Sequence, residues 1–184
     1  KAVKLLSDVY IDKHMEWSDL MYNLNILQVY DFMELGGAES HIITLSKALM
    51  ERGNNVFITS AFGPAVNSVK RLSIPFFEIN HPEKNTLMAN AGKIVEIIDN
   101  YNIDLIHVHP FQSQIVISLV KLLRDIPVVT TIHGAYLTPS VRGLGNFIDH
   151  YIFVSNETRD FHLENVLIKN KSFDVVPNSV EIVL

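Results

Sequence analysis

The feature that most constrains this chain is a regular alternation of short apolar runs with longer amphipathic segments, which begins at Asn25. The apolar runs are nearly continuous, as in strands that are covered on both faces. The intervening segments place apolar residues three and four positions apart, which is the spacing of one helix face. Strands that alternate with such helices favour right-handed crossovers between parallel strands. The sequence therefore predicts an α/β fold with a doubly wound parallel sheet.

The expected elements follow from this alternation. The predicted strands cover residues 25–30, 55–60, 75–79, 104–109, 127–133, 150–155 and 173–177. The predicted helices cover residues 37–52, 65–72, 86–101, 111–124 and 157–164. The faces that we expect to be buried carry Ala38, Ile42, Leu45 and Leu49 in one long helix and Ala91, Ile94, Val95 and Ile98 in another. We see no boundary after residue 25, so residues 25–184 are predicted to form one domain.

Residues 1–24 differ from the rest of the chain. They show two short helical stripes, made by Val3, Leu6, Val9 and Tyr10 and then by Trp17, Leu20, Met21 and Leu24. We interpret this segment as an N-terminal helical arm that packs on the domain. The alternative is a helix that binds a membrane surface or a partner, although Lys4, Asp8, Asp12 and Lys13 do not form the basic face that anionic lipids require.

Composition argues against several classes of protein. The formal net charge of −5 disfavours a nucleic-acid-binding protein, which normally has a basic excess. The absence of cysteine excludes disulfides and thiolate metal sites, and it fits a reducing compartment. The sequence has neither a run of about 18 apolar residues nor the apolar region of a signal peptide. We therefore expect a cytoplasmic protein without a transmembrane segment, and peripheral contact with the inner face of the membrane stays open.

Glycine and polar residues gather where the predicted strands end. Ligands on doubly wound sheets bind beyond the carboxyl ends of the strands. The loops to consider are residues 31–39, 61–64, 107–112, 133–136, 155–157 and 177–181.

The glycine pair Gly36-Gly37 stands directly before a predicted helix. A helix N-terminus attracts phosphate, and glycine lets a ligand approach the backbone closely. A tight turn is the simpler interpretation, because neither the dinucleotide-binding nor the Walker pattern is present. Glu39 in the first helical turn either stabilises the helix dipole, or orients a bound sugar or the glycine loop.

Three histidines lie near the same predicted sheet edge. His107 and His109 are two residues apart on one strand and therefore face the same side. His133 ends a later strand, where it could hydrogen-bond a hydroxyl, and Gly134 opens space beside it. A zinc site, and with it a metal hydrolase, is a weak alternative because no acidic ligand with matching spacing accompanies the histidines. A buried, hydrogen-bonded core histidine is the simpler interpretation for His107.

Two later motifs have simple structural explanations. Ser155 or Asn156 precedes a helix as an N-cap residue would. Pro177 and Asn178 have the composition of a turn.

Five motifs in order, "GGAE", "DLIHVH", "PVVTTIHG", "HYIFVSNETRD" and "VVPNSVE", resemble one known family. The resemblance is to the N-terminal half of GT-B-fold glycosyltransferases of family 4, which are retaining enzymes that use nucleotide sugars. It covers residues 25–184. It implies one Rossmann-like domain of two, with the active site in the cleft between them, and a C-terminal donor-binding domain that this chain does not contain. We accordingly expect a hexosyl-type transferase as the complete protein and an inactive fragment alone.

The resemblance also implies roles for residues. Gly36 and Gly37 match the loop that approaches the donor diphosphate, with Glu39 beside them. His133 matches the catalytic histidine near the transferred sugar, and Gly134, Ser155 and Asn178 match further donor-binding positions. Ser179 and Glu181 stand where the family has glycine and aspartate, which weakens the match of that turn.

The acceptor site is the least defined of these expectations. From their position in the loops, His109, Gln112 and Tyr136 are the candidates for binding a carbohydrate or lipid-linked acceptor. The family's usual chemistry needs no metal, so we expect no cofactor besides the nucleotide-sugar donor. A non-catalytic module that binds sugars or nucleotides with the same fold is the alternative function.

Overall fold

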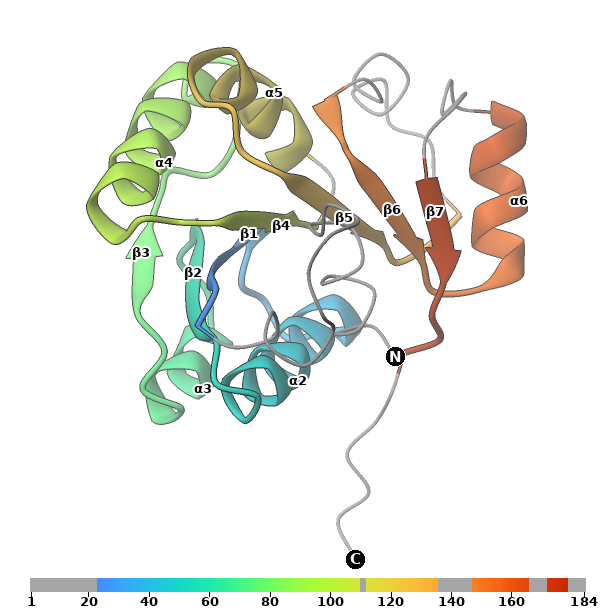
Figure 1. Ribbon diagram of the computed structural model, residues 1–184, viewed down its shortest axis with the longest axis horizontal. Helices are drawn as coiled ribbons and strands as arrows, with labels where there is room; N and C mark the ends of the chain where they lie inside the picture. Colours follow the sequence, from blue (N-terminus) through green and yellow to red (C-terminus); the bar gives the residue numbers. More distant parts are fainter. Residues whose placement is uncertain (1–22, 110–111, 136–146, 166–171, 179–184) are drawn as a thin grey trace, which may run out of the picture.

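The computed structural model describes residues 23–109, 112–135, 147–165 and 172–178 (Figure 1). These residues contain a seven-stranded sheet with the order β3-β2-β1-β4-β5-β6-β7. Every pair of neighbouring strands is parallel. The predicted α/β fold with a doubly wound, Rossmann-like sheet is therefore confirmed. The predicted helical arm covers residues 1–24, of which residues 1–22 lie outside the described residues.

Each predicted strand and helix is present, with ends that differ by one or two residues. The strands are β1 (Asn25–Phe32), β2 (Asn55–Ala61), β3 (Phe76–Glu78), β4 (Leu105–Val108), β5 (Val128–Ile132), β6 (His150–Phe153) and β7 (Ser172–Val175). The helices are α2 (Gly37–Met50), α3 (Val66–Arg71), α4 (Leu87–Tyr101), α5 (Ser113–Leu123) and α6 (Asn156–Asn165). None of the described helices is long and apolar enough to cross a membrane.

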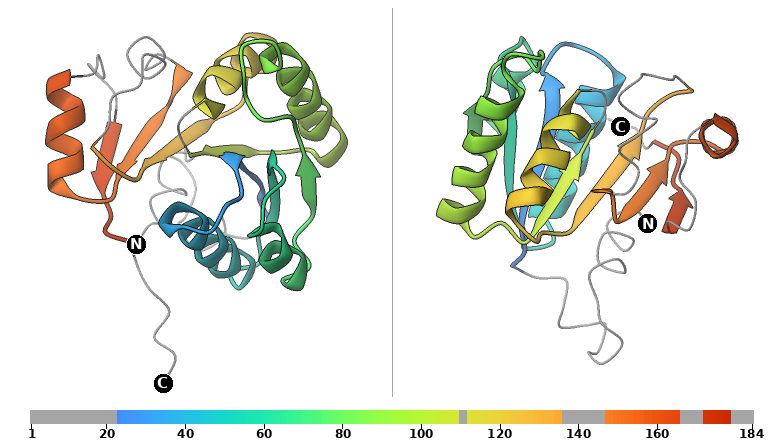
Figure 2. Two further views of the ribbon diagram at one scale, coloured as in Figure 1. Left: turned by 180° about the vertical axis from the view of Figure 1, so that it is seen from behind. Right: turned by 90° about the horizontal axis from the view of Figure 1, so that it is seen from above.

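The sheet lies between two layers of helices. Helices α2 and α3 cover one face, and α4 and α5 cover the other (Figures 1 and 2). Adjacent residues of one strand point to opposite faces: Ile26 belongs to the hydrophobic cluster that includes Ile42 of α2, and Leu27 to the cluster that includes Ile94 of α4. This arrangement explains the continuous apolar runs, because both faces of each central strand need apolar residues.

The strand order reverses between β1 and β4, and this reversal locates the site. The chain runs from β1 through β2 to β3 on one side, and then returns through α4 to place β4 on the other side of β1. The register pairs Gln28 of β1 with His107 of β4. A ligand on such a sheet binds where the loops diverge at this reversal.

At one position beside this edge, the backbone packs so closely that only glycine fits. A Cβ added to Gly63 would lie 2.2 Å from the carbonyl oxygen of Met33, which belongs to the backbone and cannot rotate away as a side chain could. The two segments are joined by the hydrogen bond from the Ala65 N–H to the same carbonyl oxygen, at 3.0 Å. Gly63 therefore lets the loop after β2 pack on the loop after β1.

We expect Gly63→Ala to lower the free energy of unfolding by at least about 2 kcal/mol, because one of the two loops must move. Urea denaturation measures this change. Gly92→Ala in α4 is the matched control, since a Cβ there meets no atom within 4 Å and alanine favours a helix by up to about 1 kcal/mol. Equal stabilities of the two variants would contradict the prediction.

Candidate functional site

Four imidazoles meet at the carboxyl ends of β1, β4 and β5. His107 and His109 come from β4 and its end, His133 directly follows β5, and His41 comes from α2. The ring centres of His109 and His133 are 5.3 Å apart, and those of His41 and His133 are 4.9 Å apart. We call these four residues the histidine cluster. The structure thus brings the three predicted histidines together and adds a fourth.

His41 was not predicted, although the sequence contains a signal for it. It lies four residues before Leu45 and three after Ala38, so it continues the apolar stripe of α2 toward the sheet edge. A histidine in such a stripe is partly buried and needs a polar partner. An interaction with the side chain of Asn178 partly offsets the lowering of the His41 pKa by burial, and His41 Nε2 has no hydrogen-bond partner among the described residues. The predicted turn residue Asn178 therefore lies beside α2 and the histidine cluster.

A hydrogen-bonded chain connects β1 to His133. His109 Nε2 lies 2.8 Å from Gln28 Oε1, and His109 Nδ1 lies 3.0 Å from His133 Nε2. Since the amide oxygen of Gln28 only accepts, His109 Nε2 carries the proton, and its Nδ1 accepts from His133 Nε2–H. His133 Nδ1 then remains as an acceptor. This nitrogen is buried, and it has no hydrogen-bond partner among the described residues.

His107 is a core residue, as its simpler interpretation predicted. It is fully buried, and its Nε2 lies 2.8 Å from Thr131 Oγ1. The ring nitrogens that form hydrogen bonds pair with Thr131, with Gln28 or with each other, so they do not converge on one point. No group of three or more potential metal ligands within the described segments could hold a metal ion. The structure gives the metal-hydrolase alternative no support.

Burial keeps the histidine cluster neutral. Desolvation is the main cause that lowers the pKa of His41, and it holds the pKa values of His107 and His109 well below the usual value. It also lowers the pKa of His133 to about 4, with repulsion from His41 as the second cause. At pH 7 His133 is therefore a neutral imidazole with one donor nitrogen and one acceptor nitrogen.

The glycine pair occupies the N-terminus of α2, as predicted. Gly36 is the N-cap residue, and Gly37 is the first residue of the helix. A Cβ on Gly36 would lie 2.7 Å from a carboxylate oxygen of Glu39, whereas a Cβ on Gly37 would meet no atom within 4 Å. Glu39 is only 6% exposed, so its carboxylate lies folded against the glycine loop. The two glycines thus differ: Gly36 faces Glu39 and Gly37 faces open space.

Asp31 fixes the same edge from the other side. Its carboxylate accepts the backbone N–H of Gln112 at 2.8 Å and of Ser113 at 2.6 Å, together with the Ser113 hydroxyl. This contact joins the end of β1 to the N-terminus of α5. It also gives hydrogen-bond acceptors to N–H groups that have no partner within the helix. The backbone of Gln112 is thereby held in place, and its side chain is exposed. Asp31 lies in one of the loops that the sequence indicated, but no local pattern predicted this contact.

The remaining predicted residues lie at separate positions. Ser155 Oγ accepts the backbone N–H of Thr158 at 3.1 Å, which confirms its interpretation as the N-cap of α6. Gly134 directly follows His133 and is partly buried. Tyr136 lies outside the described residues.

Comparisons with known proteins agree with this geometry. The model of Glycosyltransferase Family 4 matches residues 35–183. A glycosyltransferase from Rickettsia africae ESF-5 is 26% identical, with a TM-score of 0.73 over 86% of this chain and 44% of that chain. No curated protein matches the chain.

Two further solved structures share the fold. HepE from Anabaena, solved with UDP and glucose, is 18% identical with a TM-score of 0.70, over 86% of this chain and 45% of that chain. MurG from Acinetobacter baumannii is 13% identical with a TM-score of 0.67, over 86% of this chain and 46% of that chain. The chain therefore spans less than half the length of these proteins. It belongs to Glycosyltransferase Family 4, and its described residues have the fold of the N-terminal half of a GT-B glycosyltransferase.

Proposed function

We propose that the complete protein transfers a hexose, with retention, from a nucleoside-diphosphate sugar to a carbohydrate or lipid-linked acceptor. In this proposal the present chain is the acceptor-side half, and it also contributes donor contacts. The observation that carries the proposal is the position of His133 beside the strand-order reversal, in a chain of this family. HepE, which shares the fold, was solved with UDP and glucose, and this supports a nucleotide-sugar donor.

The N-terminus of α2 is the proposed diphosphate site. Its free N–H groups and the positive end of the helix dipole favour an anion. The negative charge of Glu39 would oppose a phosphate at Gly36, where its carboxylate lies. We therefore assign Glu39 the role of holding the glycine loop. The diphosphate then approaches from the open side of Gly37.

His133 is the proposed catalytic residue, and its neutrality suits the reaction. The bond between the anomeric carbon and the diphosphate oxygen breaks, the nucleoside diphosphate leaves, and positive charge develops on the sugar. The acceptor oxygen forms the new bond while its proton passes to the departing diphosphate oxygen. An imidazolium beside that positive charge would raise the barrier. A neutral imidazole whose Nδ1 accepts a hydrogen bond from a sugar hydroxyl orients the sugar without this repulsion. A pKa of about 4 also makes His133 a poor proton donor at pH 7.

Release of nucleoside diphosphate tests the proposal directly. The complete protein is incubated with UDP-, GDP- and ADP-hexoses, with and without simple glycoside acceptors, and NMR assigns the anomer of each product. Release from one donor, with the anomeric configuration kept, is the expected result. Absence of both donor binding and release across the panel would contradict the proposal.

The open space beside Gly37 leads to a prediction about donor binding. In the complete protein, Gly37→Ala should raise the donor KM about tenfold, because the new methyl group meets the diphosphate but no protein atom. The melting temperature should not fall, since alanine is at least as favourable in a helix. Gly92→Ala, the same change in α4, should leave the donor KM unchanged. An unaltered donor KM in Gly37→Ala would remove this loop from the donor site.

A further inference from the structure

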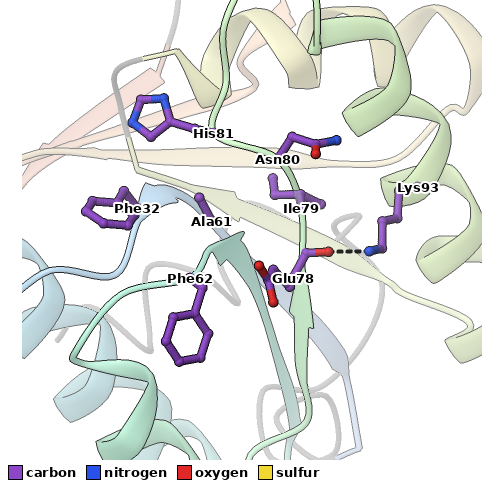
Figure 3. A pocket seen from close by; sticks show the side chains of 8 residues that line it. All are labelled: Phe32, Ala61, Phe62, Glu78, Ile79, Asn80, His81 and Lys93. Carbon is purple, nitrogen blue, oxygen red and sulfur yellow. Dashed lines mark hydrogen bonds between the residues drawn. The ribbon is translucent and has the colours of Figure 1, made fainter.

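A pocket lies on the same sheet edge, away from the histidine cluster. It is a pocket of about 510 Å³ beyond the ends of β1, β2 and β3 (Figure 3). This volume is within the range of small-molecule sites. None of its lining residues was among the predicted site residues. The side chains that matter for its chemistry are Phe32, Phe62, Glu78, Asn80, His81 and Lys93.

Aromatic rings form one part of the pocket wall. The rings of Phe32 and His81 are 5.8 Å apart at an angle of 60°. Phe62 is 48% exposed, although it is a large apolar side chain. The ammonium of Lys70 lies 5.7 Å from the centre of the Phe62 ring. The pocket therefore offers flat apolar faces that a ligand can cover.

Polar groups on the other part of the wall are held in place. Fully buried Asn90 accepts the backbone N–H of Asn80 at 3.0 Å and donates to its carbonyl oxygen at 2.9 Å. The ammonium of Lys93 donates to the backbone carbonyl of Glu78 (Figure 3). The Glu78 carboxylate forms no ion pair with another described residue and is exposed. The pocket thus combines an exposed carboxylate acceptor with an amide and an ammonium that hydrogen bonds hold in place.

This combination fits a neutral sugar ring. A pyranose has an apolar face of C–H groups, which suits aromatic rings, and a rim of hydroxyls, which suits a carboxylate and an amide. A free phosphate would be repelled by Glu78, and an acyl chain would leave the polar groups without partners. The opposite charges of Glu78 and Lys93 also match a ligand without net charge.

The distance from the pocket to His133 indicates which part of the substrate binds in the pocket. Three strand intervals separate β2 from β5, which corresponds to roughly 14 Å along the sheet edge. One monosaccharide cannot reach both places. Resting on the proposed function, we propose that this pocket is a distal subsite for a sugar residue of an extended acceptor. The enzyme then elongates an oligosaccharide chain, and the pocket holds a residue remote from the reacting hydroxyl.

Binding and turnover test this subsite separately. ¹⁵N NMR of the complete protein is recorded with trisaccharides of glucose, galactose, mannose and N-acetylglucosamine, and with the matching methyl glycosides. We expect one trisaccharide to shift the signals of Asn80 and His81 and to bind about tenfold more tightly than its methyl glycoside. Phe62→Ala and Glu78→Gln should each abolish this preference. Both side chains are exposed, so both variants should keep the wild-type melting temperature.

Matched controls and a donor assay distinguish failure of the subsite proposal from failure of the proposed function. Leu122→Ala and Glu96→Gln change exposed side chains of α5 and α4 outside the pocket and should preserve the preference. Donor release into water, measured without any acceptor, reports on the proposed function alone and should be equal in all variants. No trisaccharide-dependent shift at Asn80, or a length preference that survives Phe62→Ala, would overturn the subsite even when donor release is normal.

Discussion

Replacing His133 with alanine in the complete protein should lower kcat about 100-fold or more while leaving the acceptor KM within twofold. The side chain ends a chain of hydrogen bonds that starts at buried Gln28, and its free Nδ1 is the proposed acceptor for a hydroxyl of the transferred sugar. Loss of one preorganised hydrogen bond to the reacting sugar typically costs two orders of magnitude in kcat. Steady-state kinetics with saturating donor and acceptor measure the change.

Two further variants distinguish a chemical role of His133 from a structural one. His133→Gln keeps a donor and an acceptor on a side chain of similar reach, so it should recover part of the lost rate. His150→Gln changes another buried histidine of the sheet, which begins β6 at the opposite end of the strands, and should retain wild-type kcat. Wild-type turnover in His133→Ala would remove this residue from the mechanism.

The sequence was sufficient to predict the layers of the fold, for a physical reason. Strands such as β4 and β5 are covered on both faces, so their apolar runs are continuous, and the helices between them show one apolar stripe. These signals are local and do not depend on tertiary partners. The sequence also predicted the sheet edge at which the site lies, because parallel strands place all their carboxyl ends together.

The contacts within the site depend on tertiary structure, and sequence reasoning found few of them. Asp31 reaches the N-terminus of α5, which is 81 residues later, and Asn178 reaches His41 over an even longer separation. No local pattern encodes such a pairing. The pocket beside β3 was missed for the same reason: Phe32 and His81 meet only because β1, β2 and β3 end at one edge.

Acidification should destabilise this protein from about pH 6.5 downward. The histidine cluster is neutral and buried in the folded state, but each imidazole binds a proton near pH 6.5 once the chain unfolds. Below that pH the unfolded state therefore holds more protons, so the free energy of unfolding falls as the pH falls. For His133 the loss begins near pH 6.5, continues to about pH 4, and reaches about 3 kcal/mol.

Urea denaturation at half-unit steps from pH 7.5 to 4.5 measures this loss. His107 and His109 have pKa values that lie well below 6.5, so they add to the slope in the same direction. Arginine partners lower the pKa values of the Asp99 and Asp160 carboxylates. These groups therefore change the free energy of unfolding only below their usual pKa of 3.8, which is outside the measured pH range. His133→Gln should therefore flatten the curve between pH 6.5 and 4.5. A wild-type stability that is constant from pH 7 to 5 would show that the cluster takes up protons equally in the folded and unfolded states, and burial would then not be the cause that keeps His133 neutral.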